Sequence, residues 1–399
     1  MSVVGNQRQT FLRLASRLQP HWRALDFPQR LQSLLAAGRA FGSRDRRLYR
    51  ELLYTVSRYL PWIEPLLQAD PERAADVTAW LAADFPATRA YRAALGPAWP
   101  PCPGDLTARA AYLEQRVTEL FPAWLAGEYP EALSPPECDA LLRRAPLWLR
   151  LQTDRPEIVA AEFGRRGWVW HESAVLPGAW ELRSEADVSQ SEAYAGGLIE
   201  IQDLGSQLLL ASADLPRTGR WLDACAGAGG KTLQLARILG PTGHVDAHDI
   251  RPAALAELGR RAARAGLDNV TVLPAAPAGL YDGVLVDAPC SGSGTWRRAP
   301  HLKWAVGVAD LTEHAARQTA LLNRYSRHVC PGGLLIYATC SLARRENEDV
   351  VARFLQQDAG FSLLPPALDF GFGQSGPGLR IRPARHDTDG FYCAVLRRG

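Results

Sequence analysis

The sequence lacks any long hydrophobic run, because no apolar stretch in its 399 residues approaches the ~20 residues of a membrane-spanning helix. Its first residues, Met1 to Arg8, also lack the charged start and apolar core of a secretory signal peptide. We therefore expect a protein of the cytoplasm that has no membrane partner. Apolar residues make up 47% of the chain and charged residues 22%, which is ordinary for a globular protein of two or three domains.

Cysteine is scarce, and its spacing excludes two common structural roles. The seven cysteines include no C-x-x-C pair, and an odd, scattered set does not favour a disulfide framework. His244 and His248 lie four residues apart in a predicted strand, roughly 13 Å from each other, which is too far to share one metal ion. No metal site is therefore predicted.

Lysine is nearly absent, since Lys231 and Lys303 are the only two in the chain. Arginine supplies the positive charge, and residues 1–60 hold eleven arginines against three acidic residues although the whole chain carries only +3. Such a segment suits a phosphate backbone, and it suits a solvated helix face equally well. The eleven are Arg8, Arg13, Arg17, Arg23, Arg30, Arg39, Arg44, Arg46, Arg47, Arg50 and Arg58.

The spacing of apolar residues predicts three regions. Residues 1–105 have helical periodicity and end at the linker Pro100 to Gly104. Residues 106–195 continue as helix and then become a small α+β domain, with strands expected over Leu147–Leu151 and Gly167–Trp170. From residue 196 onward strands and helices alternate, which predicts an α/β fold with a mostly parallel, doubly wound sheet.

The C-terminal segment departs from this alternation. Leu379–Arg382 and Phe391–Leu396 are strand-like and are expected to pair in antiparallel fashion at one edge of the sheet. The predicted class is therefore α/β with an antiparallel C-terminal hairpin, preceded by a helical region and a small α+β insert.

A glycine-rich turn, Asp223 to Thr232, follows one predicted strand and opens a helix. Glycines there let the backbone approach a ligand, and the helix N-terminus favours a negative group. Asp249 ends the next strand, where an acid commonly binds ribose hydroxyls. A dinucleotide, a nucleoside triphosphate and S-adenosylmethionine all suit this arrangement, although the glycine spacing fits neither the P-loop nor the dinucleotide pattern. A plain tight turn is an equally good interpretation of the loop alone.

Two cysteines follow hydrophobic strands of the same sheet. Cys290 ends Val284 to Cys290 and Cys340 ends Leu334 to Cys340. The carboxyl ends of parallel strands line the ligand crevice of an α/β fold, so both thiols are expected at the pocket that the glycine loop opens. Buried cysteines are common small hydrophobic residues, and we accept that role for Cys225, Cys330 and Cys393. Asp287 precedes Cys290 by three residues within a proline-glycine turn, which favours a functional role for Cys290.

Over roughly residues 196–399 the chain resembles the Sun/Nop family of RNA cytosine-C5 methyltransferases. The N-terminal region more weakly resembles the NusB-like helical domain of the type B bacterial enzymes that act on small-subunit ribosomal RNA, through Ser43 to Arg47 and Leu52 to Arg58. The main matching motifs are Gln202-Asp203, Cys225 to Thr232, Asp249, Asp287 to Gly292, Arg297 to Trp304, Gln318, Tyr337 to Ser341, Glu346 to Glu348 and Asp389 to Tyr392.

The resemblance implies a catalytic assignment. Cys340 is expected to attack the cytosine, Cys290 to assist product release, and Asp287 to contact the base or the cofactor. The implied cofactor is S-adenosylmethionine, and the implied partner is RNA, most simply ribosomal RNA, with no obligate protein partner and a monomeric enzyme. The residues expected to hold the cofactor are Cys225, Ala226, Gly227, Ala228, Gly229, Gly230, Lys231, Asp249 and Asp287. Arg297, Arg298 and Lys303 are candidate substrate contacts, and packing of their loop is the alternative.

One departure from the family pattern favours rival hypotheses. The family has an aspartate after the third strand, near the adenine, whereas this chain has Pro274 to Pro277 and no acid before Asp282. A non-catalytic RNA-binding or ribosome-assembly factor on a methyltransferase scaffold therefore remains an alternative. A methyltransferase acting on transfer RNA, DNA or a small molecule is another.

Overall fold

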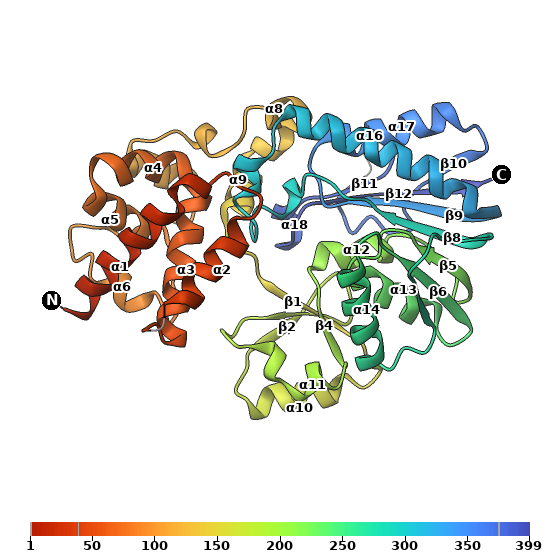
Figure 1. Cartoon of the computed structure of the whole chain (residues 1–399), viewed down its shortest axis with the longest axis horizontal. Helices are drawn as coiled ribbons and strands as arrows, with labels where there is room; N and C mark the ends of the chain where they lie inside the picture. Colours follow the sequence, from red (N-terminus) through yellow and green to blue (C-terminus); the bar gives the residue numbers. More distant parts are fainter. Residues whose placement is uncertain (1, 39, 374–375) are drawn as a thin grey trace. The chain divides into compact units, whose positions relative to one another are not determined.

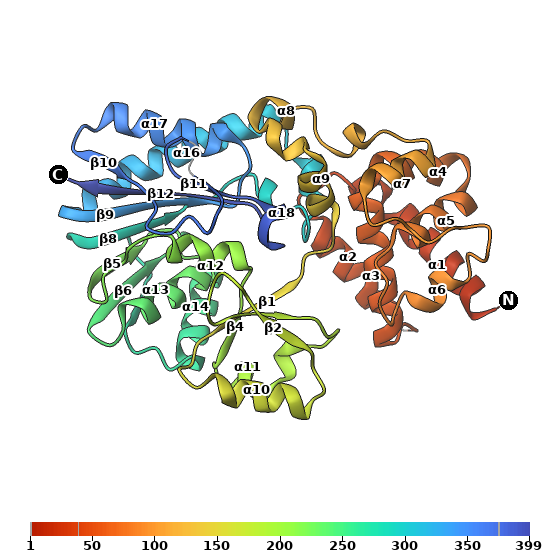
Figure 2. The same cartoon turned by 180° about the vertical axis from the view of Figure 1, so that it is seen from behind.

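The computed structural model describes residues 2–38, 40–373 and 376–399, and the chain divides into two compact units (Figures 1 and 2). The first unit contains Met1–Arg144 together with Trp296–Gly307, and the second contains Ala145–Thr295 with Val308–Gly399. The division into three domains at residues 105 and 195 stays a prediction. In the described part of the chain, no helix is both long and apolar enough to cross a membrane.

The first unit is helical, as the periodicity predicts. Phe11 of the first helix and Leu52 and Val56 of the third are fully buried, so the apolar stripes do face the core of this unit. The helices are α1 (Val3–Leu18), α2 (Phe27–Ala37), α3 (Ser43–Arg58), α4 (Leu60–Ala69), α5 (Pro71–Leu81), α6 (Arg89–Ala93), α7 (Leu106–Leu113), α8 (Leu125–Glu128), α9 (Pro135–Leu142) and α15 (Leu302–Ala305).

The second unit begins with a small antiparallel sheet in the order β2-β3-β1-β4. Its elements are β1 (Leu147–Leu151), α10 (Pro156–Arg165), β2 (Trp170–Glu172), β3 (Ala179–Leu182), α11 (Glu192–Ala195) and β4 (Ile199–Ile201). The predicted strand over Gly167–Trp170 is wrong for its first residues. Gly167 has a φ of +66° and forms the turn after α10, and the Trp168 ring packs on Phe163 at 5.2 Å, so pairing begins only at Trp170.

The main sheet has the predicted parallel core. In the described chain its strands run in the order β10-β12-β9-β8-β5-β6-β7, and the five from β9 to β7 are parallel. β11 and β10 both pair with β12 in antiparallel fashion, which confirms the predicted C-terminal pair. The strands are β5 (Gly219–Asp223), β6 (Gly243–His248), β7 (Val270–Leu273), β8 (Tyr281–Asp287), β9 (Val329–Thr339), β10 (Phe361–Leu364), β11 (Leu379–Ile381) and β12 (Phe391–Arg398).

Helices cover both faces of this sheet, so alternate residues of each strand belong to different cores. On β5, Trp221 packs in the core that α12 and α13 cover, whereas Leu222 packs in the core that α16 and α17 cover. Figure 1 shows α12, α13 and α14 on one side of the strands and α16 and α17 on the other. These helices are α12 (Leu204–Ala211), α13 (Gly230–Leu239), α14 (Pro252–Arg264), α16 (Val308–Tyr325) and α17 (Glu348–Gln357).

Candidate active site and cofactor pocket

The two predicted thiols lie together at the carboxyl ends of neighbouring strands. β8 and β9 are parallel, with Asp287 opposite Ala338, so the chain reaches Cys290 and Cys340 just beyond the same edge of the sheet. Their sulfur atoms are 3.4 Å apart, close enough for one thiol to donate its hydrogen to the other. The structure therefore brings residues that are fifty positions apart into one reactive pair.

A buried carboxylate fixes both cysteine loops. Glu346 is completely buried and accepts a hydrogen bond from Ser291 N at 2.8 Å, and it also accepts from the Ser341 hydroxyl. Gln318 on α16 donates to Glu346 Oε1 at 3.1 Å and to Pro289 O at 3.0 Å. Because one acid binds the residue after each cysteine, the separation of the two thiols is fixed by neighbours with little freedom to move.

The two thiols are not electrostatically equivalent. The hydrogen bond to Cys340, followed by burial, raises the pKa of Cys290 well above its usual value. Cys290 therefore keeps its proton and can donate it toward the Cys340 sulfur.

Lys231 and Asp287 form a buried ion pair beside the thiols, with Lys231 Nζ 2.8 Å from Asp287 Oδ2. Burial disfavours the charged amine, but the attraction of Asp287 and, further down, of Cys340 outweighs it and raises the pKa of Lys231. The Lys231 ammonium group also lies 5.4 Å from the centre of the Phe391 ring. A fixed positive charge thus stands where a thiolate would be stabilised.

The glycine loop lines a pocket of about 560 Å³. Gly227 and Gly229 have φ values of +54° and +91°, which a residue with a side chain rarely adopts. At Gly230 an added Cβ would meet nothing within 4 Å, so the backbone there is open to a ligand. The predicted cofactor residues that line the pocket are Cys225, Ala226, Gly227, Ala228, Gly230, Lys231, Asp249 and Asp287.

Asp249 directly follows β6, in the position predicted for a ribose-binding acid. It accepts a hydrogen bond from Gly227 N at 2.8 Å, and the Arg251 guanidinium lies 2.9 Å away. The hydrogen bonds from Arg251, only partly opposed by burial, lower the pKa of Asp249 to about 2. Asp249 is therefore ionised at neutral pH. Cys225 lies in the same loop, and burial raises the pKa of its thiol, so it is not a reactive group.

One part of the pocket wall is apolar and comes from two elements, which also place Arg251, Arg317 and Arg324 at the pocket. Ile250 follows Asp249 and is 86% exposed, and Leu321 and Tyr325 of α16 also line the pocket. Ala275 and Ala276 are exposed in the acid-free stretch and are not part of the pocket lining. The apolar wall thus supplies a surface for a flat ring in a site where the usual acid is missing.

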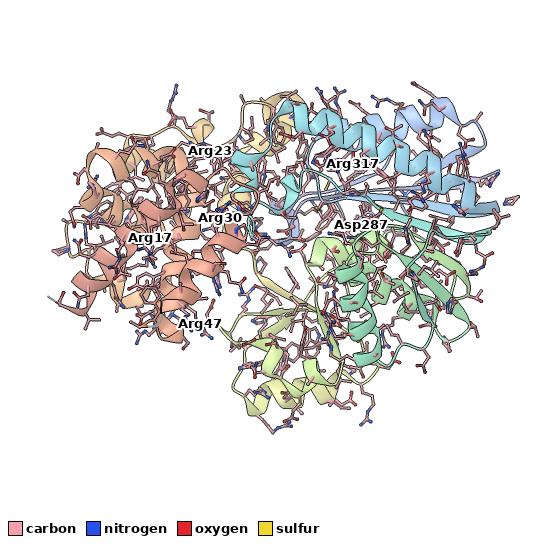
Figure 3. The ribbon with its side chains drawn as sticks, viewed as in Figure 1. Arg17, Arg23, Arg30, Arg47, Asp287 and Arg317 are labelled. Atoms are coloured by element: carbon pink, nitrogen blue, oxygen red, sulfur yellow. The ribbon has the colours of Figure 1, made fainter. Side chains whose placement is uncertain are left out.

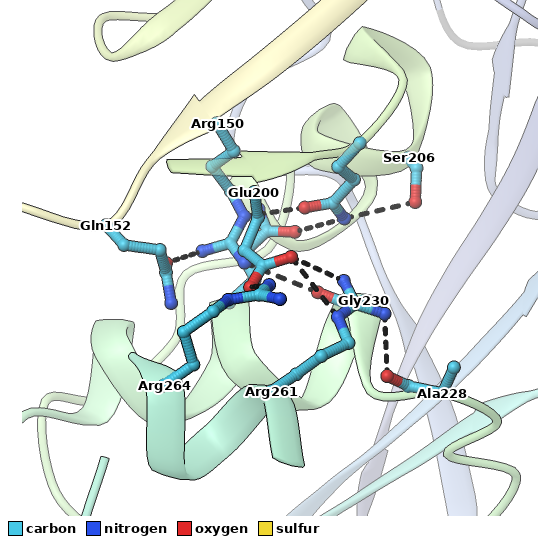
Figure 4. Close-up of polar contacts among 10 residues, drawn as sticks. Arg150, Gln152, Glu200, Ser206, Ala228, Gly230, Arg261 and Arg264 are labelled. Carbon is cyan, nitrogen blue, oxygen red and sulfur yellow. Dashed lines mark hydrogen bonds and ion pairs between the residues drawn. The ribbon is translucent and has the colours of Figure 1, made fainter. Parts of the chain in front are cut away.

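A polar network connects the small sheet to the glycine loop (Figure 4). Arg150 of β1 donates to Gln202 Oε1 at 2.6 Å and to Gly230 O at 3.5 Å, and it also donates to Gln152. Glu200 of β4 binds Arg261 at 2.8 Å, and Arg261 in turn donates to Ala228 O at 2.6 Å. Burial lowers the pKa of Arg150 to about 9. The network holds two carbonyls of the loop, those of Ala228 and Gly230.

The three candidate substrate contacts differ in burial. Arg297 and Lys303 belong to the first unit, where Arg297 is fully buried and Lys303 is 1% exposed. Lys303 Nζ donates to Arg58 O at 2.8 Å and to Leu120 O at 3.2 Å, and burial lowers the pKa of its amine well below the usual value. Packing is therefore the role that the structure shows for these two. Arg298 is exposed, and its contact with substrate stays a prediction.

Sequence reasoning missed the residues that hold the site together. In the sequence Glu346 stands out only as part of a motif of the family, Glu346 to Glu348. An acid six residues after a cysteine that ends a strand is a signal that could have indicated a buried carboxylate at the site. Arg150 and Glu200 carry no such signal, because only the pairing of β1 with β4 places them beside the loop.

Comparison with known proteins identifies the family of this chain. The family model described as 16S rRNA methyltransferase RsmB/F matches residues 209–397. Ribosomal RNA small subunit methyltransferase B of Xanthomonas campestris pv. campestris is 30% identical over 397 residues, covering 88% of this chain and 89% of that protein. The protein of the same name from Erwinia tasmaniensis is 33% identical over 273 residues, covering 65% of this chain and 61% of its own.

Solved structures agree on the fold. The crystal structure of PH0851 covers 100% of both chains with a TM-score of 0.76 at 22% identity. A methyltransferase homologue from Pyrococcus horikoshii matches 69% of this chain and 93% of its own, with a TM-score of 0.58 at 25% identity. Together with the relatives in sequence, these matches lead to one conclusion: the chain belongs to the RsmB/F family and is an S-adenosylmethionine-dependent RNA methyltransferase.

Proposed function

We propose that this protein methylates carbon-5 of a cytosine in RNA, most specifically in small-subunit ribosomal RNA, through a covalent bond between Cys340 and the base. The observation that carries the proposal is the pair of thiols 3.4 Å apart beside the glycine-loop pocket. The relatives that share most of the chain are named as small-subunit ribosomal RNA methyltransferases, which supports that RNA as the substrate.

Two sulfur atoms suit the chemistry of cytosine. Carbon-5 is a poor nucleophile, so the Cys340 thiolate first forms a bond to carbon-6 and places the released electron pair on carbon-5. S-adenosylmethionine supplies the electrophilic methyl group that carbon-5 then takes. A base removes the carbon-5 proton, the electrons of that bond restore the ring double bond, and the carbon-6 to sulfur bond breaks to return the Cys340 thiolate.

The electrostatics support Cys340 rather than Cys290 as the nucleophile. Cys290 has a raised pKa and stays protonated, whereas Lys231 is near enough to stabilise a negative charge on Cys340. Cys290 can deliver its proton to the departing Cys340 sulfur, which is the release role that the family resemblance implies. Asp287 is held by Lys231 and is positioned to contact the cytosine edge or the cofactor.

The pocket fits S-adenosylmethionine in its donor set and shape. Asp249 is ionised and can accept the ribose hydroxyls, and Gly230 leaves the loop backbone open toward the ligand. Ile250, Leu321 and Tyr325 would lie against the adenine ring. These residues allow cofactor binding without the aspartate that is missing from Pro274 to Pro277.

RNA binding is proposed for the arginine-rich helices of the first unit. Figure 3 labels Arg17, Arg23, Arg30 and Arg47, which all lie on or beside α1, α2 and α3 and are exposed. Arg23 pairs with Glu64 and Arg30 with Asp26, whereas Arg17 and Arg47 have no hydrogen bond or ion pair within the residues that the structure describes. Arg39 lies outside the described residues. Exposed, uncompensated guanidinium groups suit phosphates, and the target base must be unstacked to reach the thiols.

Cys340→Ala is expected to abolish methyl transfer, because the remaining thiol, Cys290, has a raised pKa and is a poor nucleophile. The measurement is transfer of labelled methyl from S-adenosylmethionine to small-subunit ribosomal RNA, with Cys330→Ala as the matched control on the far end of β9. Retained transfer in purified Cys340→Ala would disprove the nucleophile assignment. Bisulfite mapping of ribosomal and transfer RNA, with and without the gene, would identify the substrate.

Cys290→Ala is expected to accumulate a protein–RNA adduct, because the donor that assists departure of the Cys340 sulfur is lost. Denaturing gels after incubation with S-adenosylmethionine and RNA would show the adduct as a band of reduced mobility. The double variant lacking both thiols should show none. If Cys290→Ala turns over normally without any adduct, Cys290 has no part in release.

A further inference from the structure

The first unit contains a cavity of about 260 Å³ that the catalytic chemistry does not use. Its walls come from the ends of α3, α5, α6 and α9 and from the linker around Pro103. Arginine dominates the lining, with one acid, Asp84, among the lining residues. The arginines are Arg58, Arg92, Arg109, Arg143 and Arg144.

Three of the ion pairs that these arginines make with carboxylates are long. Arg92 Nη1 lies 3.6 Å from Asp84 Oδ1, Arg58 Nη1 lies 3.8 Å from Glu51 Oε1, and Arg144 Nε lies 3.7 Å from Glu51 Oε2. All three separations exceed the length of a hydrogen bond. For Arg58 and Arg92 these pairs therefore provide attraction without a hydrogen bond between the two charged groups.

Two buried donors stand out. Within the described residues, Arg58 Nε and Arg92 Nε are both shielded from solvent and have no hydrogen-bond partner. Arg58 as a whole is only 6% exposed. A buried guanidinium donor without an acceptor costs free energy, on the order of 1–3 kcal/mol, so such donors usually mark a missing acceptor.

Arg109 adds a third positive charge that has neutral partners. It donates to the Tyr59 hydroxyl at 2.7 Å, to Pro103 O at 2.7 Å and to Gly104 O at 3.2 Å. Asp139 acts on it only from a distance, as one of the weaker influences on its pKa. Positive charge thus accumulates around one small cavity, and an anion with several acceptor oxygens would complete it.

We propose that this cavity binds a phosphate group, and that in the working enzyme the group is a backbone phosphate of the RNA substrate. Guanidinium groups bind phosphate oxygens in pairs, and a tetrahedral anion can accept from arginines on several helices at once. The RNA source rests on the proposed function, whereas the phosphate chemistry does not. Free inorganic phosphate has the same chemistry, so the experiment must distinguish binding of free phosphate from binding of an RNA phosphate.

The test compares two arginines of the same short helix, α6. Arg92 lines the cavity, whereas Arg89 does not line it although it also faces Asp84, at 3.7 Å. Arg92→Gln and Arg89→Gln therefore remove equal charge near the same acid. Arg92→Lys keeps the charge but loses the paired donors. Circular dichroism and S-adenosylhomocysteine affinity of each full-length variant verify that both units remain folded.

Two probes are measured: inorganic phosphate, by ³¹P line broadening and thermal shift, and a labelled single-stranded fragment of small-subunit ribosomal RNA, by anisotropy at several salt concentrations. If RNA is the source, Arg92→Gln should lower RNA affinity about tenfold and reduce the salt slope by about 0.7–0.9, while Arg89→Gln changes both far less. Arg92→Lys should recover most of the slope and part of the affinity.

The remaining outcomes are decisive as well. A phosphate response that Arg92→Gln abolishes, with RNA affinity unchanged, supports the site and assigns it to free phosphate. Equal losses of RNA affinity in Arg92→Gln and Arg89→Gln, or no response to either probe, overturn the proposal. Failure of the proposed function would be visible separately, as the absence of 5-methylcytosine in RNA treated with the unaltered enzyme.

Discussion

Ile250 is an apolar side chain left in solvent at the mouth of the glycine-loop pocket. It is 86% exposed, and it follows directly after Asp249, the acid assigned to the ribose. Exposed isoleucine contributes little to the core of the protein, and a ligand bound in the pocket would cover it. We expect adenine binding to depend on it, because no acid follows β7.

Ile250→Ala is therefore expected to weaken S-adenosylmethionine binding without loss of folding stability. Loss of the covered surface corresponds to about 1–2 kcal/mol, or roughly a 5- to 30-fold rise in the dissociation constant. Isothermal titration calorimetry with S-adenosylhomocysteine measures this change in the dissociation constant. Leu280→Ala is the control, since Leu280 is 53% exposed and does not line the pocket. Equal effects of the two substitutions would contradict the role of Ile250.

At this scale the sequence predicts groups whose chemistry shows in a local motif. The glycine loop, Asp249 and the two cysteines are such groups, and the structure brings them to one edge of the sheet. The burial of a side chain, in contrast, cannot be recognised from a local motif. Lys303 was a candidate RNA contact, yet its ammonium group binds backbone carbonyls that are 183 and 245 residues away, and nothing near Lys303 in the chain indicates them.

Among the elements, the small sheet has a role that its position in the chain does not suggest. β1 and β4 pair with each other, and Arg150 and Glu200, which are neighbours in that register, support the carbonyls of Gly230 and Ala228. The parallel sheet was predictable from the alternation of strands and helices. The contacts of Arg150 and Arg261 with the cofactor loop were not predictable from the sequence. They depend on the register between β1 and β4, two short strands separated by almost fifty residues.

Arg150→Met is expected to loosen the glycine loop and raise the KM for S-adenosylmethionine by about tenfold, while kcat at saturating cofactor changes little. The lost hydrogen bonds each correspond to about 1 kcal/mol in a buried site. Steady-state kinetics with Arg155→Met as the control would measure it, since Arg155 is 72% exposed on the same small domain. Arg150→Lys should restore part of the affinity. A fall in kcat alone would contradict a positioning role.

At the scale of the whole molecule, the first unit includes a short segment that lies, in the sequence, between two parts of the second unit. The chain leaves the second unit after Thr295 and returns at Val308, and residues 296–307 are part of the first unit. Trp296 is 1% exposed there, and Arg58 donates to Arg297 O at 3.3 Å. Apolar periodicity could not predict this exchange, because it does not indicate which unit a short helix joins.

A fragment of residues 145–399 is expected to be poorly soluble, because Trp296 and its neighbours lose the residues that bury them. The same fragment with 296–307 replaced by a glycine-serine linker of equal length should be monomeric and should bind S-adenosylhomocysteine. Size-exclusion chromatography and titration measure both. If the unmodified fragment is as soluble and as stable as the linker version, residues 296–307 do not depend on the first unit for burial.

The same exchange has a consequence for synthesis on the ribosome. Domains near the N-terminus generally fold first as the chain emerges. Here the helices of residues 1–144 are made early, but their unit is complete only when Gly307 of the 399 residues has left the exit tunnel. The strands β1 to β8 are translated in that interval. The first part of the protein to be made therefore stays incomplete until the whole small sheet and half of the strands of the main sheet have been made.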